Sequence, residues 1–360
     1  MINALSLSQG GGRSFVINLL RELRRDDRGF DFTLLTLAGS LTGIDASGVA
    51  VEEMRLPRWG SPVRTPLRVL YELVGLPLHA RRFDLLFCVA DICPPLCPVP
   101  VVVLMRNLNI YDRRWFDDAR TRTLFRLARL GAPRARVAVF PTQAAADAIR
   151  ASVPVDPARV AVVPYGVSAL SFEDAPPAGA AAPYLFLAAA PEPHKNIGVL
   201  IECLRFVSDP RLEVWIAGDS LLDPAHSGKL ASAARELGVA ERVRFLGPVP
   251  YARLLSLYRG AMALVFPSFI ESFGHPLLEA MLAGTPAVVS DIPSFREIAG
   301  DAALYFPPAD ARALAARIDE LRAKPEEARQ RVEAACARAA GFTWQRSVDG
   351  LCRVFERALA

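Results

Sequence analysis

The sequence has no run of eighteen apolar residues, and its first half contains no lysine. Without such a run, no segment predicts a transmembrane helix. The opening residues, MINALSLSQGGGRSF, have neither a charged start nor an apolar core, so we expect no signal peptide. The six cysteines are scattered through apolar stretches without a CxxC pair, which predicts buried free thiols in a reducing cytoplasm and no metal site.

Charge is modest and unevenly placed along the 360 residues, which carry a net charge of +4. Residues 1–182 hold 22 arginines against 17 acidic residues, whereas residues 183–360 are close to neutral. This excess is too small for a nucleic-acid binder, so we expect no nucleic-acid partner. Because of their arginines, residues 1–182 are the part of the chain that we expect to contact an anionic surface or acceptor.

The segment from Arg113 to Arg136 is the most basic, with eight arginines, two acidic residues and several aromatic and leucine side chains. It predicts a basic amphipathic helix over residues 118–130. Two interpretations stay open: a helix that contacts an anionic membrane, or a packed helix whose outer face carries solvated arginines.

Strands and helices alternate along both halves, a pattern typical of doubly wound parallel α/β domains. The length suits two domains, and the Pro/Ala-rich stretch before residue 184 is typical of a linker. We expect domains at 1–170 and 184–342, joined by a linker at 171–183. A helical stretch over 66–81 is interrupted near 75–77, and residues 343–360 form a final amphipathic helix.

The clearest functional signal is a pair of carboxylates, Glu271 and Glu279, between two buried-type strands at 261–266 and 286–291. We expect Glu279 in the first turn of a helix over 276–283 and Glu271 on the loop before it. Acidic residues there could simply complement the helix dipole. Their place at the strand-end rim, where open α/β sheets bind ligands, favours a functional role.

Lys195 precedes an expected helix start at Asn196, where a positive charge opposes the helix dipole. A bound diphosphate would explain that lysine, and Asn196 is the expected N-cap. In the first half, the glycine-rich residues 8–13 follow a strand and precede a helix, which suits either a ligand contact or a tight turn. They lack the GxGxxG dinucleotide fingerprint, because Phe15 stands where glycine is needed.

The segment Glu271-Ser-Phe-Gly-His-Pro-Leu-Leu-Glu279, with Gly284 and Pro286 after it, resembles the E-x7-E signature of retaining GT-B glycosyltransferases of family GT4. The resemblance is specific from about residue 183 onward and loose before it. It implies two Rossmann-like doubly wound domains that face a cleft. The first would hold the acceptor and the second the nucleotide-sugar donor, with the final helix packed back on the first.

The resemblance also implies a role for each matching residue. Glu271 would face the donor sugar and Lys195 the diphosphate, as the catalytic pair, while Glu279 would hold the ribose. Ala190 stands where relatives often have an arginine, so His194 could replace that arginine or the phosphate clamp could be weaker. The remaining expected donor-binding residues are Asn196, Gly218, Gly247, Val249, Ser272, Phe273, Gly274 and His275. The expected acceptor-side residues are Gly11, Gly12, Arg13, Arg106 and Asn107, although ordinary loop polarity would also explain the last two.

The function that follows is transfer of a hexose from GDP-mannose or a UDP-sugar to a glycan or polyprenyl-linked acceptor, in bacterial surface polysaccharide synthesis. The resemblance implies no metal and no cofactor, since the nucleotide sugar is a substrate, and a cytoplasmic location with peripheral membrane contact as an option. Two alternatives stay open, a sugar-nucleotide 2-epimerase of the same fold and a non-catalytic nucleotide-sugar-binding subunit. The missing glycine fingerprint disfavours a nicotinamide oxidoreductase.

Overall fold

The computed structural model describes residues 1–6, 11–24, 28–41, 44–57, 64–115, 117–167 and 177–360. The chain divides into two compact units. Unit 1 comprises Met1–Gly166 and Trp344–Ala360, and unit 2 comprises Val167–Thr343. Val167 belongs to unit 2 because its amide donates a hydrogen bond to the Phe342 carbonyl at 3.0 Å. The expected boundary at residue 170 and the start of the expected linker at residue 171 lie outside the described residues.

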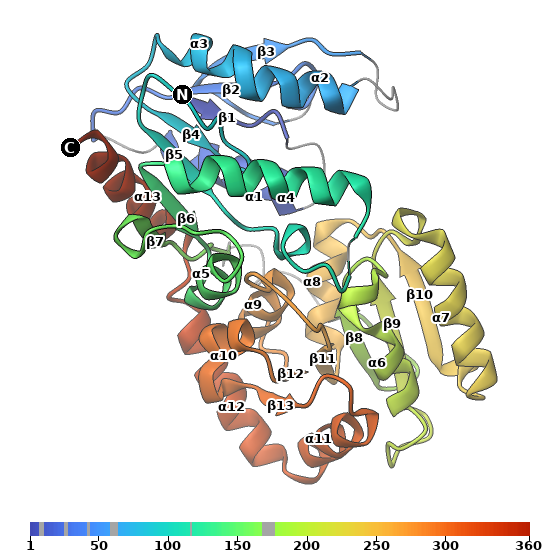
Figure 1. The fold of residues 1–360 in the computed structure, drawn as a ribbon. Coiled ribbons are helices and arrows are strands. Elements are labelled where there is room, and N and C mark those ends of the chain that lie inside the picture. The colour runs from blue at the N-terminus through green and yellow to red at the C-terminus, as the bar shows by residue number, and fades with distance from the viewer. Residues whose placement is uncertain (7–10, 25–27, 42–43, 58–63, 116, 168–176) are drawn as a thin grey trace. The chain divides into compact units, whose positions relative to one another are not determined.

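The described part of unit 1 contains a seven-stranded parallel sheet in the order β3-β2-β1-β4-β5-β6-β7 (Figure 1). Its central strands are short apolar runs buried on both faces, as parallel strands between helical layers must be. The strands are β1 (Ile2–Asn3), β2 (Thr33–Leu37), β3 (Ala50–Met54), β4 (Leu86–Cys88), β5 (Val101–Leu104), β6 (Val137–Phe140) and β7 (Val160–Val162).

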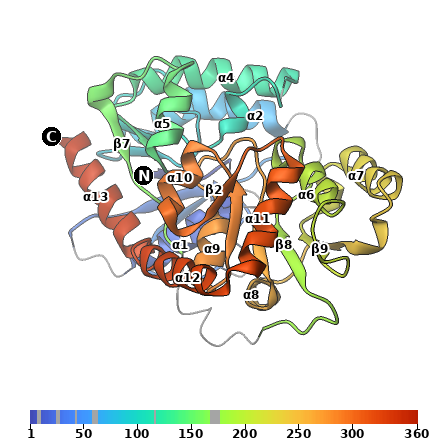
Figure 2. The same ribbon diagram turned by 90° about the horizontal axis from the view of Figure 1, so that it is seen from below.

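Helices cover both faces of this sheet (Figure 2). Helix α1 packs against α13 through Phe15 and Trp344, with 5.8 Å between ring centroids. Side chains of α3, α4 and α5 pack into one core cluster on the other face. The helices are α1 (Gly11–Leu23), α2 (Arg64–Leu70), α3 (Leu76–Ala80), α4 (Ala119–Gly131), α5 (Gln143–Arg150) and α13 (Trp344–Leu359).

The expected interruption in the 66–81 helix is a π-helical turn, η1 (Tyr71–Gly75), that joins α2 to α3. Its flanking residues Leu70 and Leu76 keep right-handed helical dihedrals, so the segment continues without a break. Gly75 is required within it because a Cβ atom there would lie 2.5 Å from the ring of Tyr71.

Unit 2 is a second Rossmann-like unit, whose described strands form a six-stranded parallel sheet in the order β10-β9-β8-β11-β12-β13. The strands are β8 (Tyr184–Ala188), β9 (Glu213–Ala217), β10 (Val243–Gly247), β11 (Ala263–Phe266), β12 (Ala287–Ser290) and β13 (Leu304–Phe306). The helices are α6 (Ile197–Cys203), α7 (Pro224–Glu236), α8 (Tyr251–Gly260), α9 (His275–Leu282), α10 (Pro293–Ala299), α11 (Ala311–Ala323) and α12 (Pro325–Ala339). The α/β fold class is therefore confirmed in both units.

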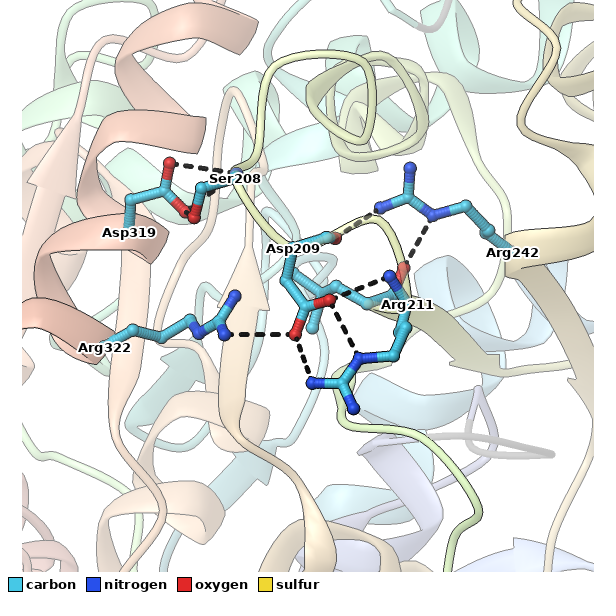
Figure 3. A network of polar contacts seen from close by, with 7 residues as sticks. Ser208, Asp209, Arg211, Arg242, Asp319 and Arg322 are labelled. Carbon is cyan, nitrogen blue, oxygen red and sulfur yellow. Dashed lines mark hydrogen bonds and ion pairs between the residues drawn. The ribbon is translucent and has the colours of Figure 1, made fainter.

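A network of arginine side chains holds the turn that precedes strand β9 in unit 2 (Figure 3). The carboxylate of Asp209 binds Arg211 at 3.2 Å and Arg322 of α11 at 3.1 Å. The Asp209 carbonyl accepts a hydrogen bond from Arg242 at 3.2 Å. This network lies at the amino-terminal end of β9, so it stabilises the sheet at the end opposite to the strand termini that carry the candidate site.

Candidate functional site

The candidate site of unit 2 forms where the strand order reverses, between the neighbouring strands β8 and β11. Loops that leave adjacent strands at such a point diverge and open a crevice at the carboxyl end of the sheet. The loop after β8 carries Lys195 and the loop after β11 carries Glu271. The sheet brings these two residues together from 76 positions apart, with 2.6 Å between Lys195 Nζ and Glu271 Oε1.

The Lys195–Glu271 ion pair is shielded, because the two side chains are only 17% and 13% exposed. The hydroxyl of buried Ser268 donates to the same Glu271 oxygen at 2.9 Å. The ammonium also lies 5.7 Å from the centre of the Phe266 ring. Glu271 therefore neutralises Lys195 in this structure, and a bound diphosphate would compete with Glu271 for the ammonium.

Glu279 lies in the second turn of α9, so its predicted place in the first turn is wrong. The helix begins at His275, one residue before the proline expected to start it, because Gly274 takes the N-cap position. The Tyr258 hydroxyl donates to Glu279 Oε2 at 2.9 Å. Burial raises the pKa of Glu279 to about 7, and the Tyr258 hydrogen bond opposes this rise.

The turn into α9 is tightly specified by Gly274, whose φ of +100° is a left-handed conformation. A Cβ atom there would also lie 2.8 Å from the ring of Phe295. Phe273 is 1% exposed and packs against Phe342 with 6.1 Å between ring centroids. The turn therefore presents half-buried Ser272 and His275 at the amino-terminal end of the helix, where backbone N–H groups favour an anion.

His194 and Asn196 flank Lys195 in the segment between β8 and α6, and Asn196 has the predicted N-cap position. Burial, followed by the charge of Lys195, lowers the pKa of His194 to about 3, so its imidazole is neutral near pH 7 in this structure. Asn196 takes the N-cap position of α6 but makes no side-chain capping bond. Its amide donates instead to the carbonyls of Pro267 at 3.0 Å and Pro308 at 2.6 Å.

Gly218 and Gly247 lie beside each other at the ends of β9 and β10, since the Gly218 amide donates to the Gly247 carbonyl at 2.9 Å. A Cβ atom on Gly218 would lie 2.1 Å from the Ala189 carbonyl oxygen, so the backbones approach too closely for any side chain. Val249 is half-buried two residues beyond Gly247. These three residues thus belong to the same strand-end rim as Lys195.

In unit 1 the strand order reverses between β1 and β4, and buried Asp91 follows β4 at that point. Asp91 Oδ1 accepts hydrogen bonds from the amides of Arg106 and Asn107 at 2.9 and 3.1 Å and from the Tyr111 hydroxyl at 3.1 Å. Burial raises the pKa of Asp91 against these hydrogen bonds. Arg106 and Asn107 are thus held in place together by a residue that the sequence did not single out.

The prediction that residues 8–13 of unit 1 form a glycine-rich loop is partly wrong. Gly11, Gly12 and Arg13 form the first turn of α1 rather than a loop, because the helix extends a full turn ahead of its first buried aromatic residue, Phe15. Ser8 to Gly10 lie outside the described residues. Among the described residues, no three His, Cys, Asp or Glu side chains gather as a metal-binding group.

Comparison with known protein families identifies both units. The family model "Glycosyltransferase Family 4" matches residues 9–169, and the model "Glycosyl transferases group 1" matches residues 175–338. The chain belongs to this glycosyltransferase family. The resemblance carried by Glu271 and Glu279 is thereby confirmed.

Curated relatives in the family include bacterial sugar transferases. The O-antigen chain mannosyltransferase RfbU of Salmonella typhimurium is 30% identical over 231 residues, 62% of this chain and 64% of that protein. The D-inositol 3-phosphate glycosyltransferase of Frankia alni is 33% identical over 228 residues, 57% of this chain and 54% of that protein. The chain therefore spans less than two thirds of the length of these relatives.

Several solved structures share the fold over nearly the whole chain. HepE from Anabaena, solved with UDP and glucose, superposes with a TM-score of 0.78 at 18% identity and covers 99% of this chain and 98% of that one. Sucrose-phosphate synthase from Thermosynechococcus elongatus gives a TM-score of 0.77 at 17% identity, with 99% and 97% covered. The predicted GT-B fold is confirmed.

Three residues of the candidate sites were missed from the sequence: Ser268, Tyr258 and Asp91. Ser268 and Asp91 each follow a buried apolar strand within a few residues, a position that could have marked them. Tyr258 lies inside α8, twenty-one positions before Glu279, and no local pattern distinguishes it from a core tyrosine.

Proposed function

We propose that this chain is a retaining glycosyltransferase that moves a hexose from a nucleotide-diphosphate sugar to a glycan or polyprenyl-linked acceptor. The observation that carries the proposal is the Lys195–Glu271 pair at the switch point of unit 2, with Glu279 in the following helix. Unit 2 would hold the donor, with Glu279 accepting hydrogen bonds from the ribose hydroxyls. Unit 1 would hold the acceptor near Arg106 and Asn107.

In the proposed reaction, the bond between the anomeric carbon and the diphosphate oxygen breaks as the acceptor oxygen bonds to that carbon on the same face. The proton of the acceptor hydroxyl passes to the departing phosphate. Negative charge grows on the phosphate, and Lys195 and the N–H groups at the start of α9 are placed to stabilise it. Because these groups supply the positive charge, we propose that the reaction needs no metal or cofactor, and we expect transfer to persist in EDTA.

Mannose is the first sugar to test, because the RfbU relative is described as a mannosyltransferase. UDP-sugars come second, because the HepE structure contains UDP and glucose. The cysteines described in the structure are free thiols, which supports the proposed cytoplasmic location, since disulfides persist mainly in oxidising compartments.

A thermal-shift panel of UDP-, GDP-, ADP- and dTDP-sugars tests donor choice, because a ligand that binds the native state raises its apparent stability. With the donor identified, we expect Glu271→Gln to lower turnover by about a hundredfold or more. The donor Kd should not rise, because the substitution also removes the carboxylate that competes with the diphosphate for Lys195. We expect Glu279→Ala mainly to raise the donor Kd.

Anomeric configuration of the product, assigned by NMR, tests retention. A product formed without acceptor, with the nucleotide sugar epimerised, would indicate a 2-epimerase instead. Donor binding with neither transfer nor slow donor hydrolysis would indicate a non-catalytic subunit. Normal transfer by both glutamate variants would overturn the site assignment.

A further inference from the structure

The surface of α2, η1 and α3 in unit 1 carries an apolar stripe made of Leu67, Leu70, Val74 and Leu78. These residues are 42%, 58%, 59% and 59% exposed. Their spacing of three and four residues places them on one side of the helix. Single exposed leucines are common on proteins, but a continuous apolar stripe is typical of an interaction surface.

The inner side of the same segment fixes its orientation. Leu76 and Ala80 are fully buried in the core. Glu72 is 3% exposed, and its carboxylate accepts a hydrogen bond from Asn3 at 3.3 Å and lies 3.8 Å from Arg68 Nε. A rotation that buried the stripe would expose Leu76 and Ala80 and separate Glu72 from Asn3. The buried contacts of this segment therefore keep the stripe on the surface.

Arginine exceeds acidic residues along the segment that carries the stripe. The sequence from residue 52 to residue 84 contains six arginines and four acidic residues, of which Glu72 is buried. Arg81 and Arg82 follow the stripe directly and are exposed, and Arg82 pairs with Glu52 at 3.1 Å. A surface of this kind is complementary to anionic headgroups above an apolar layer.

Helix α4 extends this charge, since it packs on the same face of the sheet as α3. Phe125 of α4 is turned inward and contacts Tyr111 with 6.2 Å between ring centroids. Arg120, Arg126 and Arg129 are exposed and have no carboxylate partner in the part of the chain that the structure describes. Helix α4 is thus a packed helix whose arginine-rich outer face is exposed, and the stripe of exposed apolar side chains lies on α2, η1 and α3.

We propose that this side of unit 1, the stripe together with the α4 arginines, docks on an anionic phospholipid bilayer. The stripe would enter the boundary between headgroups and acyl chains, and the arginines would bind lipid phosphates. Among the described residues no helix is long and apolar enough to cross a membrane, so the contact would be peripheral. A second copy of the chain is a poorer occupant, because a symmetric contact would bring two arginine-rich surfaces together.

The test is co-sedimentation of the full chain with vesicles of phosphatidylcholine alone or mixed with phosphatidylglycerol. We expect binding to the anionic vesicles only, weakened by added salt. The triple variant Leu70→Ser, Val74→Ser, Leu78→Ser should bind at least about tenfold more weakly. The double variant Arg126→Gln, Arg129→Gln should lose about fivefold for each arginine removed. The matched control is Leu221→Ser, Leu222→Ser, which changes residues of unit 2 that are 79% and 61% exposed and should bind like the wild type.

Circular dichroism spectra and thermal midpoints show whether each variant is folded. If the triple variant does not fold, the single substitutions Leu70→Ser and Leu78→Ser are compared instead. Absence of vesicle binding, or equal loss in the Leu221 and Leu222 control, overturns the proposal. So does a dimer, detected by analytical ultracentrifugation, that the stripe substitutions dissociate. The test uses no nucleotide sugar, so its outcome is independent of the proposed transfer reaction.

Discussion

At the scale of single residues, the carboxyl of Glu279 changes its charge near neutral pH, because burial raises its pKa to about 7. Ribose hydroxyls can donate to an ionised carboxylate, whereas a protonated one offers weaker acceptors. The diphosphate of a nucleotide sugar keeps its charge in this range. We therefore predict that donor affinity, measured by calorimetry, increases about tenfold from about pH 6 to about pH 8, with the ionised fraction of Glu279.

The variant Glu279→Gln is the control, since it keeps the shape of the side chain and has no proton to lose. Its donor affinity should be lower at about pH 8 and nearly independent of pH. In the free protein the same group has the opposite effect: a raised native pKa means that stability is lost as pH rises from the unfolded value towards 7. A wild-type affinity that stays flat, or that falls as pH rises, would contradict the ribose role.

The sequence predicts those site residues that lie close together along the chain, and it does not predict contacts between residues that are far apart in it. Glu271 and Glu279 are eight residues apart, so one local motif identified both. The contact of Lys195 with Glu271 depends on the order of β8 and β11 in the sheet, and spacing along the chain carries no signal for it. The start of α9 was misplaced because the rule that proline favours the first helical position competes with the left-handed Gly274, which caps the helix.

At the scale of elements, Asn196 ties three loops at the carboxyl end of the unit 2 sheet. Its backbone is left-handed, with φ +54°, and its amide binds carbonyls that follow β11 and β13. We predict that Asn196→Ala lowers the thermal midpoint and raises the donor Kd, because it removes both hydrogen bonds and strains the backbone. The expected loss is about 2–4 kcal/mol of stability.

Asn196→Gly is the matched variant, because glycine tolerates the left-handed conformation but cannot make the hydrogen bonds. It should be more stable than the alanine variant by about 1 kcal/mol. Equal midpoints for the two variants would show that backbone strain contributes nothing. A wild-type donor Kd in both variants would show that these two hydrogen bonds of Asn196 do not contribute to donor binding.

The elements themselves were largely predictable, since apolar runs and helical periodicity placed most strands and helices within a few residues. The exceptions have specific causes. The glycines at positions 11 and 12 suggested a loop, but the helix continues through them to cover the sheet. The π-turn η1 was expected only as an interruption near Gly75, because sequence periodicity cannot distinguish a wider turn from a break.

At the scale of the whole molecule, unit 2 is continuous in sequence, whereas unit 1 is completed by α13 from the end of the chain. Phe355 of α13 packs against Phe87 of β4 with 5.2 Å between ring centroids, and the Ser347 hydroxyl binds the Pro164 carbonyl at 2.6 Å. Trp344, Val348 and Leu351 are buried in the same unit. A fragment that ends before Trp344 would expose this apolar surface of α1 and the sheet.

We therefore predict that a fragment of residues 167–343 folds alone and binds the donor within about tenfold of the full chain, because Lys195, Glu271 and Glu279 all lie in unit 2. A fragment of residues 1–166 should unfold or aggregate.

In the full chain, Phe355→Ala should destabilise unit 1 by about 3–5 kcal/mol and leave donor affinity unchanged. Calorimetric scans with and without donor distinguish the units, since donor should raise only the transition of unit 2. A cooperative 1–166 fragment, or loss of donor binding by the 167–343 fragment while it remains folded, would contradict this division of the molecule.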